Sequence, residues 1–199
     1  GMMATLKHFP GHGDTDVDSH LGLPIINNPR ERLDAVEVPP FKAGIAAGAD
    51  AVMTAHIELP ALDDGAFAPA SLSHNVITGL LRGELKFDGL VYTDSLGMDA
   101  VSKALTPGEA AVRAIIAGND VVLHSPDDRA AFAGIKAAVE RGEITMARID
   151  TSVMRILRAK ARVGLHLQKI VPLDQVADKV GGRANALVAK NVSEKSITL

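Results

Sequence analysis

Two segments of this chain combine the side-chain types that nucleophilic attack and proton transfer require. In the second of them, the apolar run Leu90-Val91-Tyr92 leads through Thr93 into Asp94. A carboxylate at the end of a buried strand is held rigidly and is partly shielded from water, which suits a nucleophile that attacks an electrophilic carbon. Asp is also a common residue at a helix start, so Asp94 could instead cap a helical turn that follows it.

The first segment, residues 7–20, supplies a candidate proton donor. His20 follows Asp18 by two residues, and residues i and i+2 of an extended loop point the same way. Asp18 can then bind one ring nitrogen, fix the tautomer and favour the imidazolium, which leaves the other nitrogen to give and take a proton. The alternative is a solvated histidine in a polar loop. His12 in the same segment is expected to brace the loop.

Alternating acidic residues in this segment raise the question of a metal ion. Asp14, Asp16 and Asp18 are spaced as in a calcium loop, but the sixth and twelfth positions hold Ser19 and Ile25, where such a loop needs Gly and Glu. The histidines show no spacing typical of zinc. We therefore expect no metal and no cofactor.

Strands and helices alternate along the chain. Short apolar strands are predicted at residues 3–8, 51–56, 89–93 and 120–124, and helical spacing follows at residues 39–47, 75–81, 108–117, 130–141 and 149–165. The strands are unbroken apolar runs, as in strands that are covered on both faces. The pattern predicts an α/β fold with a parallel sheet.

Polar side chains end each predicted strand. Lys7 and His8 end the first, and His56, Asp94 and His124 end the other three. The active site of a (β/α) barrel is built at the C-terminal ends of its strands, so a barrel accounts for all four at once. Four strand–helix units make half of an eight-unit barrel. His56 and His124 either line the pocket or are buried, hydrogen-bonded barrel histidines.

The motifs resemble those of a known family. Lys7-His8-Phe9-Pro10-Gly11-His12-Gly13, followed by Asp18-Ser19-His20 and later by Thr93-Asp94-Ser95-Leu96-Gly97-Met98, is similar to the catalytic motifs of glycoside hydrolase family 3, in its β-N-acetylhexosaminidase branch. The resemblance implies that residues 1–170 form the C-terminal half of a TIM (β/α)8 barrel, with four parallel strand–helix units. Residues 171–199 would be a linker and the start of a truncated second α/β domain, with a helix and a strand in residues 188–199.

The same resemblance implies a function. The expected activity is that of a retaining glycoside hydrolase, which removes terminal β-linked N-acetylglucosamine from cell-wall or chitin-derived sugars. Retention needs a carboxylate nucleophile and a proton donor. Asp94 would form the covalent glycosyl intermediate, and His20, backed by Asp18, would be the acid/base. Lys7 and His8 are implied to bind the sugar hydroxyls; packing at the mouth of the barrel is the alternative.

Two other functions stay open. A neutral imidazole, unlike a carboxylate, does not repel a phosphate dianion, so the same residues suit a β-N-acetylglucosaminide phosphorylase. A half-barrel also has two open sheet edges, which favour pairing with another copy. We therefore expect a homodimer or higher oligomer. The second of the two other functions is that of a catalytically incompetent fragment that only self-associates.

Composition limits the classes of partner. The chain has 199 residues, of which 21 are basic and 24 are acidic, for a formal net charge of -3. The charges are mixed along the sequence, so we expect a carbohydrate ligand and neither nucleic acid nor a membrane as a partner. The chain lacks cysteine, which leaves the compartment undetermined between cytoplasmic and exported.

Overall fold

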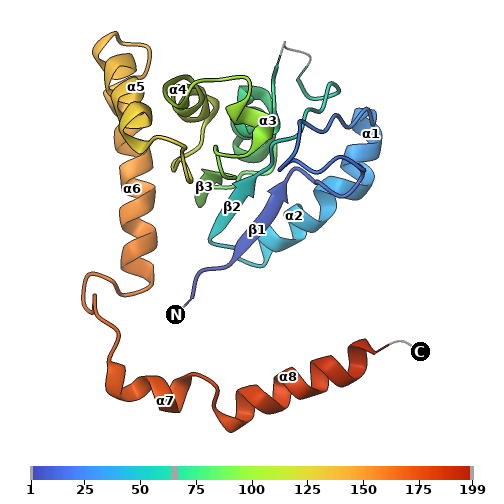
Figure 1. Ribbon diagram of the computed structural model, residues 1–199, viewed down its shortest axis with the longest axis vertical. Helices are drawn as coiled ribbons and strands as arrows, with labels where there is room; N and C mark the ends of the chain where they lie inside the picture. Colours follow the sequence, from blue (N-terminus) through green and yellow to red (C-terminus); the bar gives the residue numbers. More distant parts are fainter. Residues whose placement is uncertain (1, 64–66, 198–199) are drawn as a thin grey trace. The chain divides into compact units, whose positions relative to one another are not determined.

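The structure is a computed structural model that describes residues 2–63 and 67–197. The chain divides into two compact units, Gly1–Val163 and Gly164–Leu199 (Figure 1). The first unit contains the parallel sheet with the helices around it, and the second contains short helices.

The sheet of the first unit has three parallel strands. β1 (Thr5–Phe9), β2 (Ala51–Thr54) and β3 (Leu90–Thr93) lie in the order β1-β2-β3. Cα partners are Thr5 with Ala51 and Ala51 with Leu90, so the first residues of the strands are in register. Three of the four predicted strands are therefore confirmed, with bounds within two residues of the prediction.

The fourth predicted strand, residues 120–124, is reduced to one isolated parallel bridge between Tyr92 and Val121. Two of its hydrogen bonds to β3 involve side chains: the Val91 amide donates to Asp120 Oδ2, and the Leu123 amide donates to Thr93 Oγ1. Because side-chain atoms replace backbone atoms in these contacts, a regular ladder is not continued. The prediction of four complete strands is thus wrong for the fourth.

Helices follow each strand, mostly where helical spacing predicted them. After β1 come α1 (Arg30–Arg32), the π-helix η1 (Leu33–Glu37) and α2 (Val38–Ala46), and after β2 come η2 (Ala70–Leu72) and the π-helix η3 (Asn75–Glu84). The remaining helices of this unit are α3 (Asp99–Ser102), α4 (Pro107–Ala117), α5 (Asp128–Glu140) and α6 (Met146–Arg162). The start of α4 is fixed by a capping box between Thr106 and Glu109.

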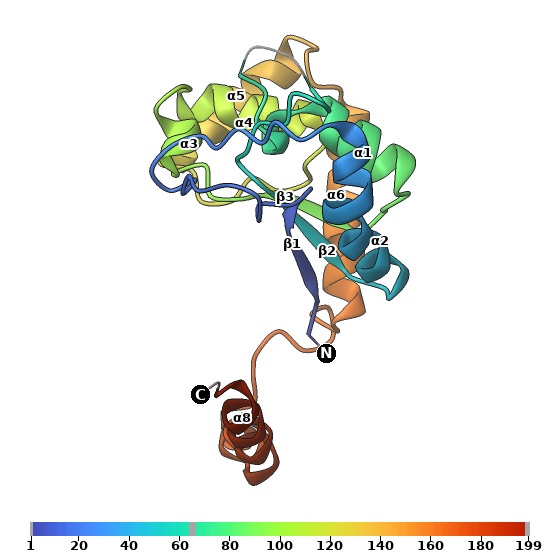
Figure 2. The same cartoon turned by 90° about the vertical axis from the view of Figure 1, so that its right-hand side faces the viewer.

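The core lies on one face of the sheet. Leu6, Val52 and Val91, one from each strand, pack into the same apolar cluster as residues of α2 and η3. Since side chains alternate along a strand, Thr5, Met53 and Tyr92 lie on the other face, where the Tyr92 hydroxyl donates to Thr5 Oγ1 at 2.7 Å. Among the described residues of the first unit, helices cover only the first face of the sheet (Figures 1 and 2). The unbroken apolar runs of the strands had instead predicted that both faces would be covered.

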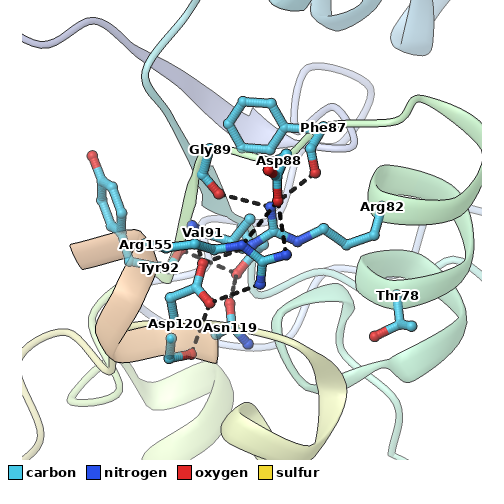
Figure 3. A network of polar contacts seen from close by, with 12 residues as sticks. Thr78, Arg82, Phe87, Asp88, Gly89, Val91, Tyr92, Asn119, Asp120 and Arg155 are labelled. Carbon is cyan, nitrogen blue, oxygen red and sulfur yellow. Dashed lines mark hydrogen bonds and ion pairs between the residues drawn. The ribbon is translucent and has the colours of Figure 1, made fainter. Parts of the chain in front are cut away.

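A buried ion-pair network joins the N-terminal part of β3 to two helices. Its centre is Asp120, whose side chain is 0% exposed. Asp120 Oδ2 lies 2.6 Å from Arg82 on η3, and Oδ1 accepts from Ser152 at 2.7 Å and lies 3.3 Å from Arg155 on α6 (Figure 3). The network connects η3 and α6 to β3 near the start of that strand, whereas the polar residues His8 and Asp94 lie at the C-terminal ends of β1 and β3.

The second unit consists of η4 (Leu173–Gln175), α7 (Val176–Lys179) and α8 (Arg183–Ser196). The first two lie inside the predicted linker, and α8 contains most of the helix expected in residues 188–199. The strand expected at its end falls partly on residues 198–199, which lie outside the described residues. The division at residue 170 stays a prediction. Across the described residues, every helix is too short or too polar to traverse a lipid bilayer.

Candidate active site

The ends of β1 and β3 bring the two predicted motifs together. His8 Nε2, from the motif at residues 7–20, lies 3.4 Å from Asp94 Oδ2, from the motif that ends β3. The carboxyl ends of parallel strands meet at one edge of a sheet, which is why residues 86 positions apart in the sequence come into contact.

Asp94 is held by the backbone on both sides. Its amide donates to the Thr54 carbonyl of β2 at 3.0 Å, and its Oδ1 accepts from the Ser95 amide at 2.8 Å. The side chain is 17% exposed at the strand end, and the backbone contact of its carboxylate is made by Oδ1 and not by Oδ2. The alternative of a helix cap is wrong, because α3 begins only at Asp99 and its N-cap residue is Met98.

His8 is half-buried beside Asp94, and the pKa of its imidazole is lowered. Burial is the largest cause; the charge of Asp94 opposes it, and Lys7, His12 and His20 lower the pKa further. The ring is therefore neutral at neutral pH, and it can donate or accept a hydrogen bond. Lys7 is exposed, so it does not incur the cost of burying an unpaired ammonium group.

Asp18 and His20 form the contact that their spacing predicted. Asp18 Oδ1 accepts from the His20 amide at 2.9 Å and lies 2.8 Å from His20 Nδ1. These two hydrogen bonds lower the pKa of the Asp18 carboxyl group. The side chains are 57% and 74% exposed, and within residues 2–63 and 67–197 no hydrogen bond or ion pair links His20 to Asp94.

The loop that carries this pair is anchored at several points. His12 Nε2 lies 2.9 Å from the hydroxyl of Ser19, which is 5% exposed, and Asp14 accepts from the Asn28 side chain at 2.7 Å. His12 thus braces the loop, as expected. Across the described part of the chain, no group of three or more His, Cys, Asp or Glu is arranged to hold a metal ion.

A hollow of about 420 Å³ separates part of the loop from the helices that follow it. Its walls include Lys7 and His8 on one side and Glu37 and Phe41 on the other, but Asp94 does not line it. At one margin the loop packs closely: Gly11 has φ +138°, and a Cβ there would lie 2.7 Å from the Cβ of Glu37. Only glycine fits at position 11.

Two histidines at the other strand ends contact the residue after Asp94. His56 is fully buried, with Nδ1 2.6 Å from Ser71 Oγ and Nε2 2.8 Å from the Ser95 carbonyl oxygen. His124 is exposed, with Nδ1 2.7 Å from Ser95 Oγ. His56 is thus a buried, hydrogen-bonded histidine. Sequence reasoning missed Ser71 and Ser95, since a serine carries no signal of a partner distant in the sequence.

Comparison with known proteins places these motifs in a family context. The sequence family model named glycosyl hydrolase family 3 N terminal domain matches residues 1–159. A beta-hexosaminidase of Stenotrophomonas maltophilia (strain K279a) is 48% identical over 124 residues, which are 62% of this chain and 36% of that protein.

Solved structures show the same likeness. A glycoside hydrolase family 3 beta-N-acetylglucosaminidase from Paenibacillus sp. superposes with a TM-score of 0.82 and 51% identity, covering 86% of this chain and 33% of that one. Beta-glucoside phosphorylase BglX bound to 2FGlc superposes with a TM-score of 0.92 and 29% identity, covering 100% of this chain and 37% of that one. The chain spans 30% to 37% of the length of several curated relatives that it matches.

Proposed function

This chain belongs to glycosyl hydrolase family 3, and from that premise we propose that it carries the catalytic groups of a retaining β-N-acetylglucosaminidase. The substrate is terminal β-linked N-acetylglucosamine in cell-wall or chitin-derived sugars. The first unit is a fragment of the family's barrel domain, and we assign it to the last four strand–helix units. The observation that carries the proposal is the 3.4 Å contact between His8 and Asp94, which unites the two motifs.

Asp94 acts as the nucleophile through Oδ2. Its other oxygen is occupied by the Ser95 amide, which leaves Oδ2 to attack the anomeric carbon and form a glycosyl ester. The neutral His8 ring beside Oδ2 can hydrogen-bond the sugar without neutralising the nucleophile as a strong cation would. Exposed Lys7 supplies a second donor to sugar hydroxyls.

His20 acts as the acid and base. Because the Asp18 carboxylate can only accept, the Nδ1 of His20 carries a hydrogen. Nε2 then holds the proton that is given to the leaving oxygen, and it takes a proton from water in the second step. The exposed position of the pair requires that the loop close over the sugar for this transfer, since proton transfer needs hydrogen-bond distance.

Hydrolysis of an aryl β-N-acetylglucosaminide is the test. We expect cleavage by the unaltered chain and a loss of about 10³-fold or more in Asp94→Asn, because the amide cannot form the glycosyl ester. His74→Asn changes an exposed histidine away from the strand ends and is the matched control. Equal rates in the unaltered chain and Asp94→Asn would exclude Asp94 as the nucleophile.

Phosphorolysis is the second candidate, and the likeness to the beta-glucoside phosphorylase over the whole chain favours it. The acid/base that we propose is an imidazole, which admits a phosphate dianion to the glycosyl ester more readily than a carboxylate does. The two reactions differ in their product. Sugar 1-phosphate formed on addition of phosphate would support the phosphorylase, and free sugar at an unchanged rate would support the hydrolase.

A third candidate is a half-barrel that self-associates without catalysis. The open side of β1 and the exposed face around Thr5 favour such pairing. A folded, dimeric sample that neither cleaves the aryl glycoside nor forms sugar 1-phosphate would support this candidate over both enzymes.

A further inference from the structure

Ser95 connects the candidate nucleophile to two histidines from neighbouring strands. Its amide donates to Asp94 Oδ1 at 2.8 Å, and its carbonyl oxygen lies 2.8 Å from His56 Nε2. Its hydroxyl oxygen lies 2.7 Å from His124 Nδ1. All the polar groups of Ser95 therefore have partners, and one of these partners is the Asp94 carboxylate.

The His56 ring has one tautomer that satisfies both of its contacts. The Ser95 carbonyl can only accept, so Nε2 must carry a hydrogen. Burial lowers the pKa of His56, which keeps the ring neutral and makes Nδ1 an acceptor for the Ser71 hydroxyl. Ser71 is also 0% exposed, and its carbonyl accepts from the Asn119 side chain at 2.8 Å. The donor to Ser95 is thus fixed from behind by a buried chain of hydrogen bonds.

His124 holds Ser95 from the exposed side. Its backbone has φ +47°, which is uncommon for a residue other than glycine and is retained only where surrounding contacts fix it. Those contacts include the Gly97 amide, which donates to the His124 carbonyl at 3.1 Å. From this fixed backbone, Nδ1 of the ring reaches the Ser95 hydroxyl.

We propose that His56 and His124 are positioning residues, which hold Ser95 between them and so set the direction of the Asp94 carboxylate. The Ser95 amide then occupies Oδ1, and Oδ2 lies on the side of His8 Nε2, at 3.4 Å. This inference rests on the proposed role of Asp94 as the nucleophile. Neither histidine touches the reacting atoms; each acts through Ser95.

Matched variants separate the hydrogen bond from simple packing. His56→Leu removes the donor to Ser95, whereas the terminal amide of His56→Gln can place a donor near the position of Nε2. His124→Ala and His124→Asn form the corresponding pair on the exposed side, and Asn tolerates a positive φ. His74→Leu is the control, because His74 is exposed and outside the site.

Two readouts are measured on the full chain. The amide resonance of Ser95 in proton–nitrogen NMR spectra reports its hydrogen bond to Asp94 without any substrate. The kcat and KM for an aryl β-N-acetylglucosaminide report catalysis. In His56→Leu we expect the Ser95 amide proton to move upfield and kcat to fall about 10- to 100-fold with KM within about threefold, because a small misplacement of a reacting group is costly. His56→Gln should restore most of the Ser95 amide proton shift and most of kcat. His124→Ala should show the same upfield shift and the same fall in kcat, each of smaller size.

The outcomes are distinguishable. If folded His56→Leu keeps the amide resonance of Ser95 in place, the inference is overturned whatever the activity. If His56→Gln is as impaired as His56→Leu, the ring acts by packing and the positioning hydrogen bond is excluded. An unaltered chain without any cleavage would overturn the proposed function alone, since the Ser95 resonance still decides whether His56 holds this turn. Failure of His56→Leu to fold leaves the decision to the His124→Ala and His124→Asn pair.

Discussion

At the scale of single residues, burial of the neutral His56 ring makes the stability of the fold depend on pH. Its pKa in the folded chain is lowered, first by burial, from the ordinary value of about 6.5. Below about pH 6.5 the His56 imidazole therefore binds a proton in the unfolded chain but not in the folded chain. The free energy of unfolding falls as the pH is lowered.

We expect His56→Gln to remove this dependence. Between pH 7.5 and 5 the unaltered chain should lose more unfolding free energy than His56→Gln, by at most about 1.4 kcal/mol for each unit by which its pKa is lowered. Urea denaturation at the two pH values measures the difference. Parallel losses in the two proteins would show that His56 does not titrate on unfolding.

Single residues also show where sequence reasoning succeeds and where it stops. The spacing of Asp18 and His20 predicted their contact, because two residues this close in the sequence can meet without help from the rest of the chain. The backbone there is a turn, in which the Leu21 amide donates to the Asp18 carbonyl, and not the extended loop that the prediction assumed. The hydrogen bonds to Ser95 come from His56 and His124, which are 39 and 29 positions away in the sequence. Such contacts follow from the order and register of the strands, so they needed the structure.

At the scale of elements, the Asp120 network holds β3 to η3 and α6. The Asp120 carboxylate is fully buried, and Arg82 and Arg155 beside it are 12% and 19% exposed. Removal of one member of a buried pair leaves an uncompensated charge. We expect Asp120→Ala to lower the unfolding free energy by about 3–5 kcal/mol.

The matched control is Glu140→Ala, which breaks an exposed pair with Lys136 on α5. Exposed pairs contribute about 0–1 kcal/mol, so this variant should unfold almost as the unaltered chain does. Thermal or urea denaturation compares the two. A loss in Asp120→Ala no larger than that in Glu140→Ala would show that the network adds nothing to stability.

Side-chain hydrogen bonds explain why the sequence predicted β2 and β3 but not the irregular pairing of residues 120–124 with β3. Unbroken apolar runs located β2 and β3 closely, since both strands cross the buried core. The segment at residues 120–124 is also largely apolar, but the Asp120 side chain accepts from the Val91 amide of β3, and the Thr93 hydroxyl accepts from the Leu123 amide. Hydrophobic pattern does not report that competition.

At the scale of the whole molecule, the open side of β1 is the feature from which we predict self-association. β1 pairs with β2 on one side, and within the described residues no strand pairs with its other side. The Ala4 carbonyl accepts from the Ala51 amide of β2. Because backbone groups alternate along a strand, the N–H and C=O of Thr5 point to the open side, where they are available to the edge of a second copy.

We therefore expect a dimer that depends on the Thr5 backbone. Thr5→Pro removes the N–H at the open edge while leaving the groups that face β2, so it should shift the chain toward monomer. Thr5→Val removes the hydroxyl that accepts from Tyr92 but keeps the N–H, so it should associate as the unaltered chain does. Sedimentation velocity over a range of concentrations measures both. If Thr5→Pro and Thr5→Val sediment alike as dimers, association uses a surface other than this edge; if the unaltered chain is a monomer throughout, the open edge does not drive pairing.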